Sequence, residues 1–249
     1  MYEKGVLVAS DQNTEWLLPW WWQKYSTCNT LPVVFVDFGM TKESLTWCKE
    51  RGEVIPFKVP SFCKPLSQES GIEAEKLYGT SCFQSRDAWF KKPSACLLSP
   101  FLKTLWLDLD CEVLSSLDDV FLYLEEGSEL AVSYGYAENL PKILEGAGEA
   151  GTICNSGVLV FRKGSELLQK WEKKALEESD KYLGDECILS ILLAESLDTV
   201  SLLPEEYNWR MTRGVPVCAK VIHWKGEWGK SYIAKHGGLK DLLPSCFLS

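Results

Sequence analysis

The sequence predicts an open α/β fold with a mixed, mainly parallel sheet flanked by helices, and three observations support this. Short apolar runs occur at Val6–Ala9, Val33–Val36 and Val54–Val59. Stretches of helical character separate these runs, and such alternation is typical of parallel sheets built from strand–helix–strand units. A later apolar strand, Leu105–Leu107, runs directly into a pair of aspartates. Polar groups at a strand's carboxyl end are typical of ligand sites in open α/β sheets.

Capping residues define the first two helices. Asn13 or Thr14 is suited to cap a helix over Glu15–Trp22, because either side chain can accept a hydrogen bond from a free backbone N–H. Thr41 is expected to cap a second helix that stops at Gly52. The later chain predicts helices over Arg86–Leu102 (in two pieces broken at Pro93), Leu117–Leu124, Leu167–Glu178 and Glu186–Ala194, and strands over Glu129–Ser133, Gly157–Phe161 and Val221–His223. With loop expected over 60–82 and neither an internal repeat nor a linker, we expect one domain over 1–249.

Composition narrows the class of protein. The chain has 249 residues, and its formal net charge of −9 argues against nucleic acid as a partner, because phosphate backbones need a basic surface. The ten cysteines include no Cys-x-x-Cys pair and fit small core residues in a reducing compartment. The start of the sequence shows no secretory signal, and no run approaches a membrane span of about 20 apolar residues. We therefore expect a cytoplasmic protein.

The sharpest functional signal is the pair Asp108 and Asp110. In an extended chain, residues i and i+2 point to the same side, so both carboxylates are expected at one spot. Two like charges so close repel each other unless a cation lies between them. A hard divalent ion satisfies the pair and can also bridge the phosphates of a nucleotide diphosphate. The simpler interpretation, a solvated strand end, stays open.

Five segments in order resemble glycosyltransferase family 8, which includes glycogenin and bacterial lipooligosaccharide galactosyltransferases and has the GT-A fold, a Rossmann-like architecture. Leu107-Asp108-Leu109-Asp110 resembles the family's Asp-x-Asp motif, and the match extends over nearly the whole chain. The other matching segments are Ala9-Ser10-Asp11-Gln12-Asn13, Asn155-Ser156-Gly157-Val158-Leu159, Gly184-Asp185-Glu186 with Ile188-Leu189, and His223-Trp224-Lys225-Gly226. Lys92 precedes Asp108 at the spacing of the family's donor-contacting lysine.

The resemblance implies transfer of a hexosyl unit from a nucleotide diphosphate sugar, UDP-linked, to a hydroxyl acceptor with retention of configuration. The acceptor would be a glycan, a lipid-linked sugar or a protein, and peripheral membrane contact is compatible with it. The implied metal ligands for Mn²⁺ or Mg²⁺ are Asp108, Asp110 and His223. The implied donor-binding residues are Ala9, Asp11, Asn13, Lys92, Asp108, Leu109, Gly226 and Lys230, and the implied catalytic residues are Asp185, Glu186 and Asn155. Acceptor contacts are expected in the loops 60–90 and 135–152.

Several of these assignments have structural alternatives. Asp11 or Asn13 can serve as a helix cap, and Asp185 can be a helix N-terminal charge favoured by the dipole. Lys230 follows Gly226 by four residues rather than the family's three, so Lys225 competes with it for the phosphates. Glu186 stands where many relatives carry glutamine. Trp20-Trp21-Trp22 fits core packing, an acceptor platform or a membrane interface.

Two other functions remain open at the level of sequence. A haloacid-dehalogenase-like phosphatase also carries Asp-x-Asp after a strand, but that nucleophile normally ends the first strand, and Leu189 stands where its later acidic motif needs a carboxylate. A non-catalytic nucleotide-sugar-binding protein would explain the irregular lysine spacing and Glu186.

Overall fold

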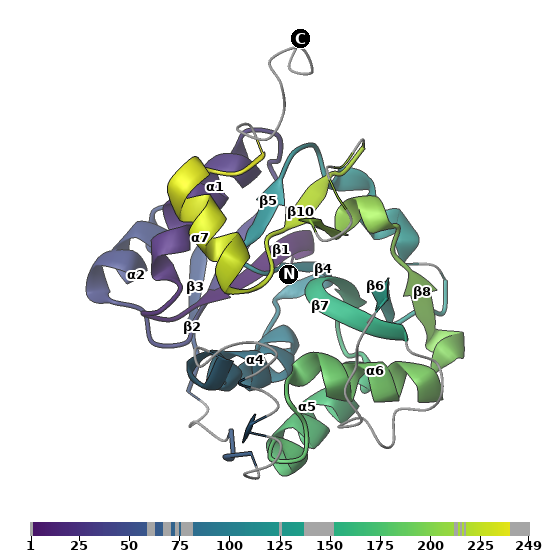
Figure 1. Ribbon diagram of the computed structural model, residues 1–249. Coiled ribbons are helices and arrows are strands. Elements are labelled where there is room, and N and C mark those ends of the chain that lie inside the picture. The colour runs from purple at the N-terminus through teal and green to yellow at the C-terminus, as the bar shows by residue number, and fades with distance from the viewer. Residues whose placement is uncertain are drawn as a thin grey trace.

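A seven-stranded sheet forms the centre of the computed structural model, which describes residues 2–58, 63–66, 71–72, 75, 82–124, 126–136, 152–211, 214, 216 and 218–239. The strand order is β3-β2-β1-β4-β7-β6-β8 (Figure 1). Only β7 runs antiparallel to its neighbours, which confirms the expected mixed, mainly parallel sheet. The strands are β1 Tyr2–Ser10, β2 Val33–Asp37, β3 Glu53–Pro56, β4 Phe101–Leu107, β6 Leu130–Tyr136, β7 Thr152–Arg162 and β8 Val200–Leu202.

A second, small sheet of three strands lies beyond the carboxyl end of β4. It consists of β5 (Cys111–Val113), β10 (Val221–His223) and β9 (Trp209–Arg210). β10 pairs antiparallel with β5, which places His223 opposite Cys111. This pairing brings the late strand β10 next to the segment that directly follows β4.

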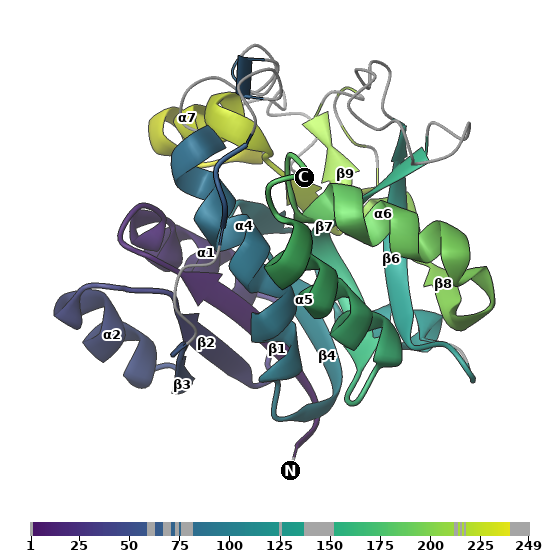
Figure 2. The same cartoon turned by 90° about the horizontal axis from the view of Figure 1, so that it is seen from below.

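Helices cover both faces of the main sheet. α1 and α2 lie on one face with α7, whereas α4, α5 and α6 lie on the other (Figures 1 and 2). The helices are α1 Leu18–Ser26, α2 Lys42–Lys49, α4 Cys82–Leu97, α5 Glu166–Glu178, α6 Asp185–Glu195 and α7 Gly226–His236. Short 3₁₀ turns are η1 Glu15–Leu17, η2 Asp118–Tyr123, η4 Leu197–Thr199 and η5 Glu205–Tyr207.

The alternation of side chains along the strands divides the core into two layers. Val6 and Val8 pack with α1, whereas Leu7 between them packs with the buried residues of α4 and α5. On β4, Leu105 likewise packs in the layer with α1, whereas its neighbour Trp106 packs in the layer with α4 and α5. Because both layers are apolar, the strands read as nearly continuous hydrophobic runs, as expected of a parallel sheet covered on both faces.

The prediction of a helix over Arg86–Leu102 is wrong in two respects, the position of its end and the expected interruption at Pro93. α4 is one continuous helix that contains Pro93 and stops at Leu97, and β4 already begins at Phe101. Pro93 removes one helical hydrogen bond, but the buried side chains around it keep the helix packed on the sheet. Pro100 disfavours a helical conformation of the residue before it, which explains why the helix ends first.

The caps differ from expectation at one of the two early helices. Thr41 caps α2 as expected, because its side chain accepts from the N–H of Ser44. η1 precedes α1, and Thr14 at its N-cap makes no side-chain cap bond. Asp11 instead accepts from the backbone N–H groups of Asn13 and Thr14 at 3.0 Å each. β3 ends at Pro56 rather than reaching residue 59, which lies outside the described residues.

The Trp20-Trp21-Trp22 run mainly serves the core. Trp21 is fully buried, and the flanking tryptophans are partly buried against the same core layer. Trp20 also donates to the carbonyl of Gly237 after α7 at 3.0 Å.

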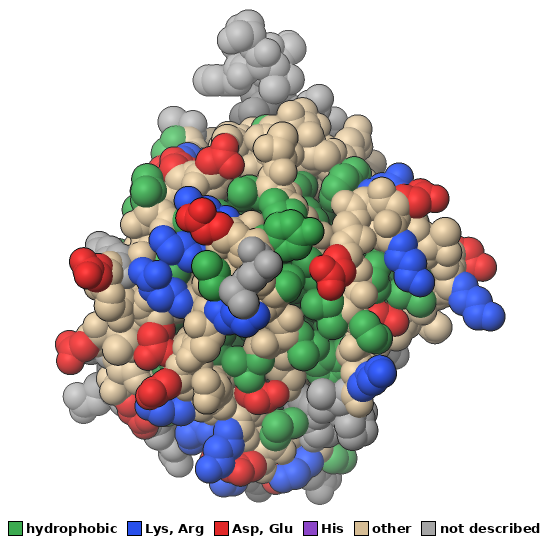
Figure 3. Space-filling view, turned by 180° about the vertical axis from the view of Figure 1, so that it is seen from behind, with side chains coloured by type: hydrophobic (Ala, Val, Ile, Leu, Met, Phe, Trp, Pro, Cys, Tyr) green, Lys and Arg blue, Asp and Glu red, His purple; other side chains and the backbone are tan. Residues whose placement is uncertain are grey.

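None of the described helices combines the length and the apolar character that a bilayer-spanning helix needs. Acidic and basic side chains are interspersed on the face opposite the view of Figure 1 (Figure 3).

Candidate active site at the carboxyl edge of the sheet

Two backbone hydrogen bonds fix the turn that carries the paired aspartates. The N–H of Asp108 donates to the carbonyl of Gly157 on β7 at 2.8 Å. The N–H of Trp224 donates to the carbonyl of Asp110 at 2.9 Å. The turn is thereby held between the main sheet and the strand β10 that ends in His223.

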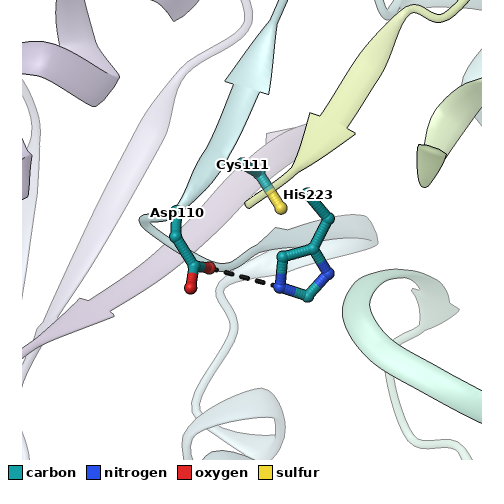
Figure 4. Close-up of side chains that lie close together, drawn as sticks. All are labelled: Asp110, Cys111 and His223. Carbon is teal, nitrogen blue, oxygen red and sulfur yellow. Dashed lines mark ion pairs between the residues drawn. The ribbon is translucent and has the colours of Figure 1, made fainter. Parts of the chain in front are cut away.

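Asp110 and His223 face each other at the centre of the site (Figure 4). Oδ1 of Asp110 lies 3.2 Å from Nε2 of His223, and Oδ2 lies 2.8 Å from Nζ of Lys230. Burial raises the pKa of Asp110, but Lys230 and His223 more than offset this and hold it well below its usual range. Lys230, from α7, therefore reaches the aspartate pair despite its unusual spacing from Gly226.

Asp108 turns toward a different set of partners. Its Oδ1 accepts from Nε1 of Trp106 at 2.7 Å and lies 3.0 Å from Nζ of Lys92. Its Oδ2 lies 3.9 Å from Nε2 of His223. The structure thus brings Asp108, Asp110 and His223 together, although the two carboxylates have different neighbours.

An irregularity in β7 supplies the floor of the site. The pairing of β6 with β7 shifts register after Val132, which leaves extra residues on β7 between Asn155 and Leu159. Bulges of this kind commonly re-aim side chains next to active sites. Gly157 lies in this stretch, and a Cβ there would overlap with the ring of His223. The Asn-x-Gly segment is therefore shaped to seat the imidazole.

A buried lysine connects the aspartate pair to α6. Nζ of Lys92 contacts Oγ of Ser156 at 2.9 Å and lies 3.7 Å from Oδ2 of Asp185. Burial alone lowers the pKa of Lys92, but Asp108 and Asp185 outweigh it and raise the pKa above its ordinary value. Burial, only partly offset by Lys92, raises the pKa of Asp185 to about 6. Lys92 is thus not a solvated surface lysine.

Glu186 is held from three sides. Its Oε1 accepts from Nδ2 of Asn155 at 2.6 Å and from the N–H of Ser156 at 3.2 Å, and its Oε2 lies 2.6 Å from Nζ of Lys225. Burial raises the pKa of Glu186, but Lys225 outweighs it and keeps the pKa below its usual value. Lys225 and Lys230, the two candidates for the phosphate-binding lysine, therefore have separate partners. Lys225 pairs with Glu186 and Lys230 pairs with Asp110.

The expected nucleotide loop follows β1 at the same edge of the sheet, because β1 and β4 are parallel neighbours. Asp11 uses both carboxylate oxygens within this loop and binds Asn13 and Thr14. Asp11 therefore stabilises the turn after β1. Of the two predicted nucleotide ligands Asp11 and Asn13, Asn13 is the more exposed. Ala9 is half-buried at the end of β1.

Two other predicted donor ligands offer only their backbone. The side chain of Leu109 is buried in the core layer of α1. Gly226 opens α7 with a φ of 82°, a conformation that other residues rarely adopt. The predicted acceptor loops lie partly outside the described residues, which omit 59–62, 67–70, 73–74, 76–81 and 137–151.

The donor set suits a divalent cation. Carboxylate oxygens and an imidazole nitrogen converge, and ligands around an octahedral Mg²⁺ lie roughly 2.9 Å apart, close to the 3.2 Å between Asp110 and His223. Asp110, Cys111 and His223 also offer ligand atoms within 4.8 Å of one another (Figure 4). Burial raises the pKa of the Cys111 thiol well above its usual value, and only a thiolate is a good ligand. Asp108 is therefore the better third ligand.

Three residues of the site carried no assignment from sequence. Asn208 is buried and contacts both Asn155 and His223. Ser156 and Trp106 hold Lys92 and Asp108. Ser156 and Trp106 lie within or next to recognised motifs, which is a usable signal. Asn208 follows the short turn η5 and has no such signal.

Comparison with known proteins places the fold. No protein-family model and no curated protein matches the sequence. Solved structures do match, including the galactosyltransferase LgtC bound to donor and acceptor sugar analogs (TM-score 0.62, 15% identity, 98% of this chain and 99% of that chain). Mouse xyloside xylosyltransferase 1 matches with a TM-score of 0.56 and 15% identity over 89% of this chain and 97% of its own. GlyE of Streptococcus pneumoniae matches with a TM-score of 0.54 and 19% identity over 91% and 55%. The chain therefore has the GT-A fold of these glycosyltransferases.

Proposed function

We propose that this protein is a metal-dependent glycosyltransferase that moves a hexosyl unit from a nucleotide diphosphate sugar, UDP-linked, to a hydroxyl with retention of configuration. The acceptor is a glycan, a lipid-linked sugar or a protein. The GT-A fold, shared with enzymes whose names specify sugar transfer, supports this proposal. The proposed setting is cytoplasmic, with peripheral membrane contact where the acceptor is lipid-linked.

One observation carries the proposal. Asp110 and His223 place ligand atoms 3.2 Å apart at the carboxyl edge of the sheet, and Asp108 lies beside them. Ligands of open α/β sheets bind at this edge. Mn²⁺ or Mg²⁺ held by these three residues would neutralise charge on the departing diphosphate.

The remaining residues divide between donor and sugar. Lys230 already lies at the aspartate pair, so it is placed to bind a phosphate oxygen once the cation takes over Asp110. Lys92 stabilises the carboxylate of Asp108 through the ion pair between these two residues. Asp185 and Glu186, at the first turn of α6, are proposed to face the transferred sugar. Asn13 and the backbone around Ala9 are proposed to hold the nucleoside.

The phosphatase alternative has no structural support. Its nucleophile normally ends the first strand, whereas Asp108 follows β4, the fourth strand among the described residues. The non-catalytic alternative was based partly on the irregular lysine spacing. Because Lys230 nevertheless reaches Asp110, that spacing does not argue against turnover.

A thermal-shift panel of nucleotide sugars with and without Mn²⁺ tests the proposal. A true donor at 100 times its Kd stabilises the protein by about 2.7 kcal/mol, and the shift should require the metal. Transfer or donor hydrolysis should then follow with the same sugar. Donor-independent cleavage of a generic phosphate ester, or tight donor binding without any turnover, would contradict the proposal.

The matched variants are Asp110→Asn and Asp118→Asn. Asp118 is an exposed carboxylate on η2, so its loss should leave transfer unchanged. Asp110→Asn removes a proposed metal ligand and should abolish the metal-dependent shift. Full activity of Asp110→Asn in the presence of a chelator would rule the mechanism out.

A further inference from the structure

Asn155 is almost fully buried, at 2% exposure, and both ends of its amide bind protein groups. Nδ2 donates to Oε1 of Glu186 at 2.6 Å. Oδ1 accepts from the N–H of Gly157 at 3.1 Å and from Nδ2 of Asn208 at 2.8 Å. A side chain engaged in this way is suited to hold its neighbours rather than to contact a sugar.

Two neighbours of Asn155 determine which end of its side-chain amide is the oxygen, because one can only donate a hydrogen bond and the other can only accept one. The N–H of Gly157 always donates, so the Asn155 atom that faces it must be Oδ1. An ionised carboxylate only accepts, so the atom that faces Glu186 must be Nδ2. Glu186 is held as a carboxylate because its second oxygen pairs with Lys225 at 2.6 Å.

The imidazole of His223 lies against this oxygen. Nδ1 of His223 is 2.9 Å from Oδ1 of Asn155 and 3.2 Å from Oδ1 of Asn208. Asn208 turns its Nδ2 toward Asn155, so the end that it presents to His223 is also an acceptor. Neither oxygen carries a hydrogen, and the proton of both contacts must therefore come from Nδ1.

We propose that Asn155, together with Asn208, is the positioning residue that keeps Nδ1 of His223 protonated and thereby leaves Nε2, the ring nitrogen on the side of Asp110, as the one available to a bound cation. Histidines that bind a metal commonly donate their other ring N–H to an oxygen, which fixes both the tautomer and the ring orientation. The use of Nε2 as a metal ligand rests on the proposed function. The protonation of Nδ1 rests on the hydrogen bonds alone.

The chain has only two histidines, which makes a direct measurement simple. Protein labelled with ¹⁵N-histidine is compared with its His236→Gln variant, so that the two ring nitrogens of His223 are assigned. We expect Nδ1 to resonate in the protonated range, in metal-free protein and with Mg²⁺. An unprotonated Nδ1 in the wild-type protein would overturn the proposal without any variant at the site.

Three variants test the positioning role itself. Asn155→Ala removes the acceptor, so Nδ1 should lose its protonated signature and Mn²⁺ affinity should fall by about 10-fold to 100-fold. Asn208→Ala, a smaller change, should shift both readouts in the same direction. Glu186→Gln keeps an acceptor oxygen for Asn155 and should retain the wild-type Nδ1 signal.

The readouts separate this proposal from the proposed function. Folded Asn155→Ala and Asn208→Ala proteins that both keep the wild-type Nδ1 signal and Mn²⁺ affinity would contradict the positioning role. A wild-type protein that binds no divalent cation, yet shows a protonated Nδ1, would contradict only the metal-dependent function.

Discussion

Lys230 places its ammonium 2.8 Å from Oδ2 of Asp110, on the side of the carboxylate opposite His223. The position follows from α7, which begins at Gly226 and carries Lys230 about one helical turn further. Burial lowers the pKa of Lys230, but Asp110 outweighs it and raises the pKa above its usual value. Lys230 thus occupies an oxygen that a metal ion or a phosphate-bound metal would also use.

Replacing Lys230 with methionine should therefore change two affinities in opposite directions. Mn²⁺ alone should bind more tightly, because a competing positive charge beside Asp110 is gone. The nucleotide sugar should bind about 10-fold to 100-fold more weakly, the cost of one charged hydrogen bond. Titration of both ligands by calorimetry measures this. Lys225→Met is the control, since Lys225 pairs with Glu186, and parallel losses of metal and donor would contradict the competition.

The ion pairs of Asp110 should also appear in the acid stability. Its native pKa lies below the unfolded value of about 3.9, so the native state binds fewer protons. The stability that ionised Asp110 contributes is present above the unfolded pKa and is lost as the pH falls below it. The difference in unfolding free energy between wild type and Asp110→Asn should therefore shrink from about pH 6 to about pH 3. A pH-independent difference in urea titrations would show that the pairs do not form.

The strand that precedes Asp108 and the strand that ends in His223 were both predictable from sequence. Each is a short apolar run that meets a polar residue, and the spacing along the chain needs no knowledge of the tertiary structure. Their meeting is different, because it depends on the three-residue strand β5 pairing with β10. The periodicity within a strand does not report which distant strand it pairs with.

Helix α7 and Asn208 show the same limit. α7 starts at a glycine, contains Gly229 and has no side-chain cap bond, so local propensity does not favour a helix there. Packing of the aromatic residues Trp224 and Tyr232, whose rings stack at 4.8 Å, accompanies it instead. Asn208 gains its role only from the approach of β7 and β10, which sequence spacing does not report.

Asp185 should give the opposite pH dependence from Asp110. Burial raises its pKa to about 6, above the unfolded value, so the native state binds more protons between these two values. Native stability should therefore decrease as the pH rises from about 4 to about 6 and then level off. Asp185→Asn lacks this ionisation, and wild type should lose stability relative to it across that range. Denaturant titrations at several pH values measure the difference, and a wild type that gains stability relative to the variant would contradict the buried environment.

Gly157→Ala tests the packing of the His223 imidazole against Gly157. A Cβ at this position would overlap with the Cε1 and Nδ1 atoms of His223, and the backbone carbonyl of Gly157 is fixed by its bond to Asp108. The ring must therefore move, and overpacking of this kind costs about 1–3 kcal/mol. Gly71→Ala is the matched control, because no atom lies within 4 Å of its added Cβ. We expect Gly157→Ala to lower the melting temperature and to weaken the Mn²⁺-dependent shift. A variant with wild-type metal binding would show that His223 is not the ligand that this glycine accommodates.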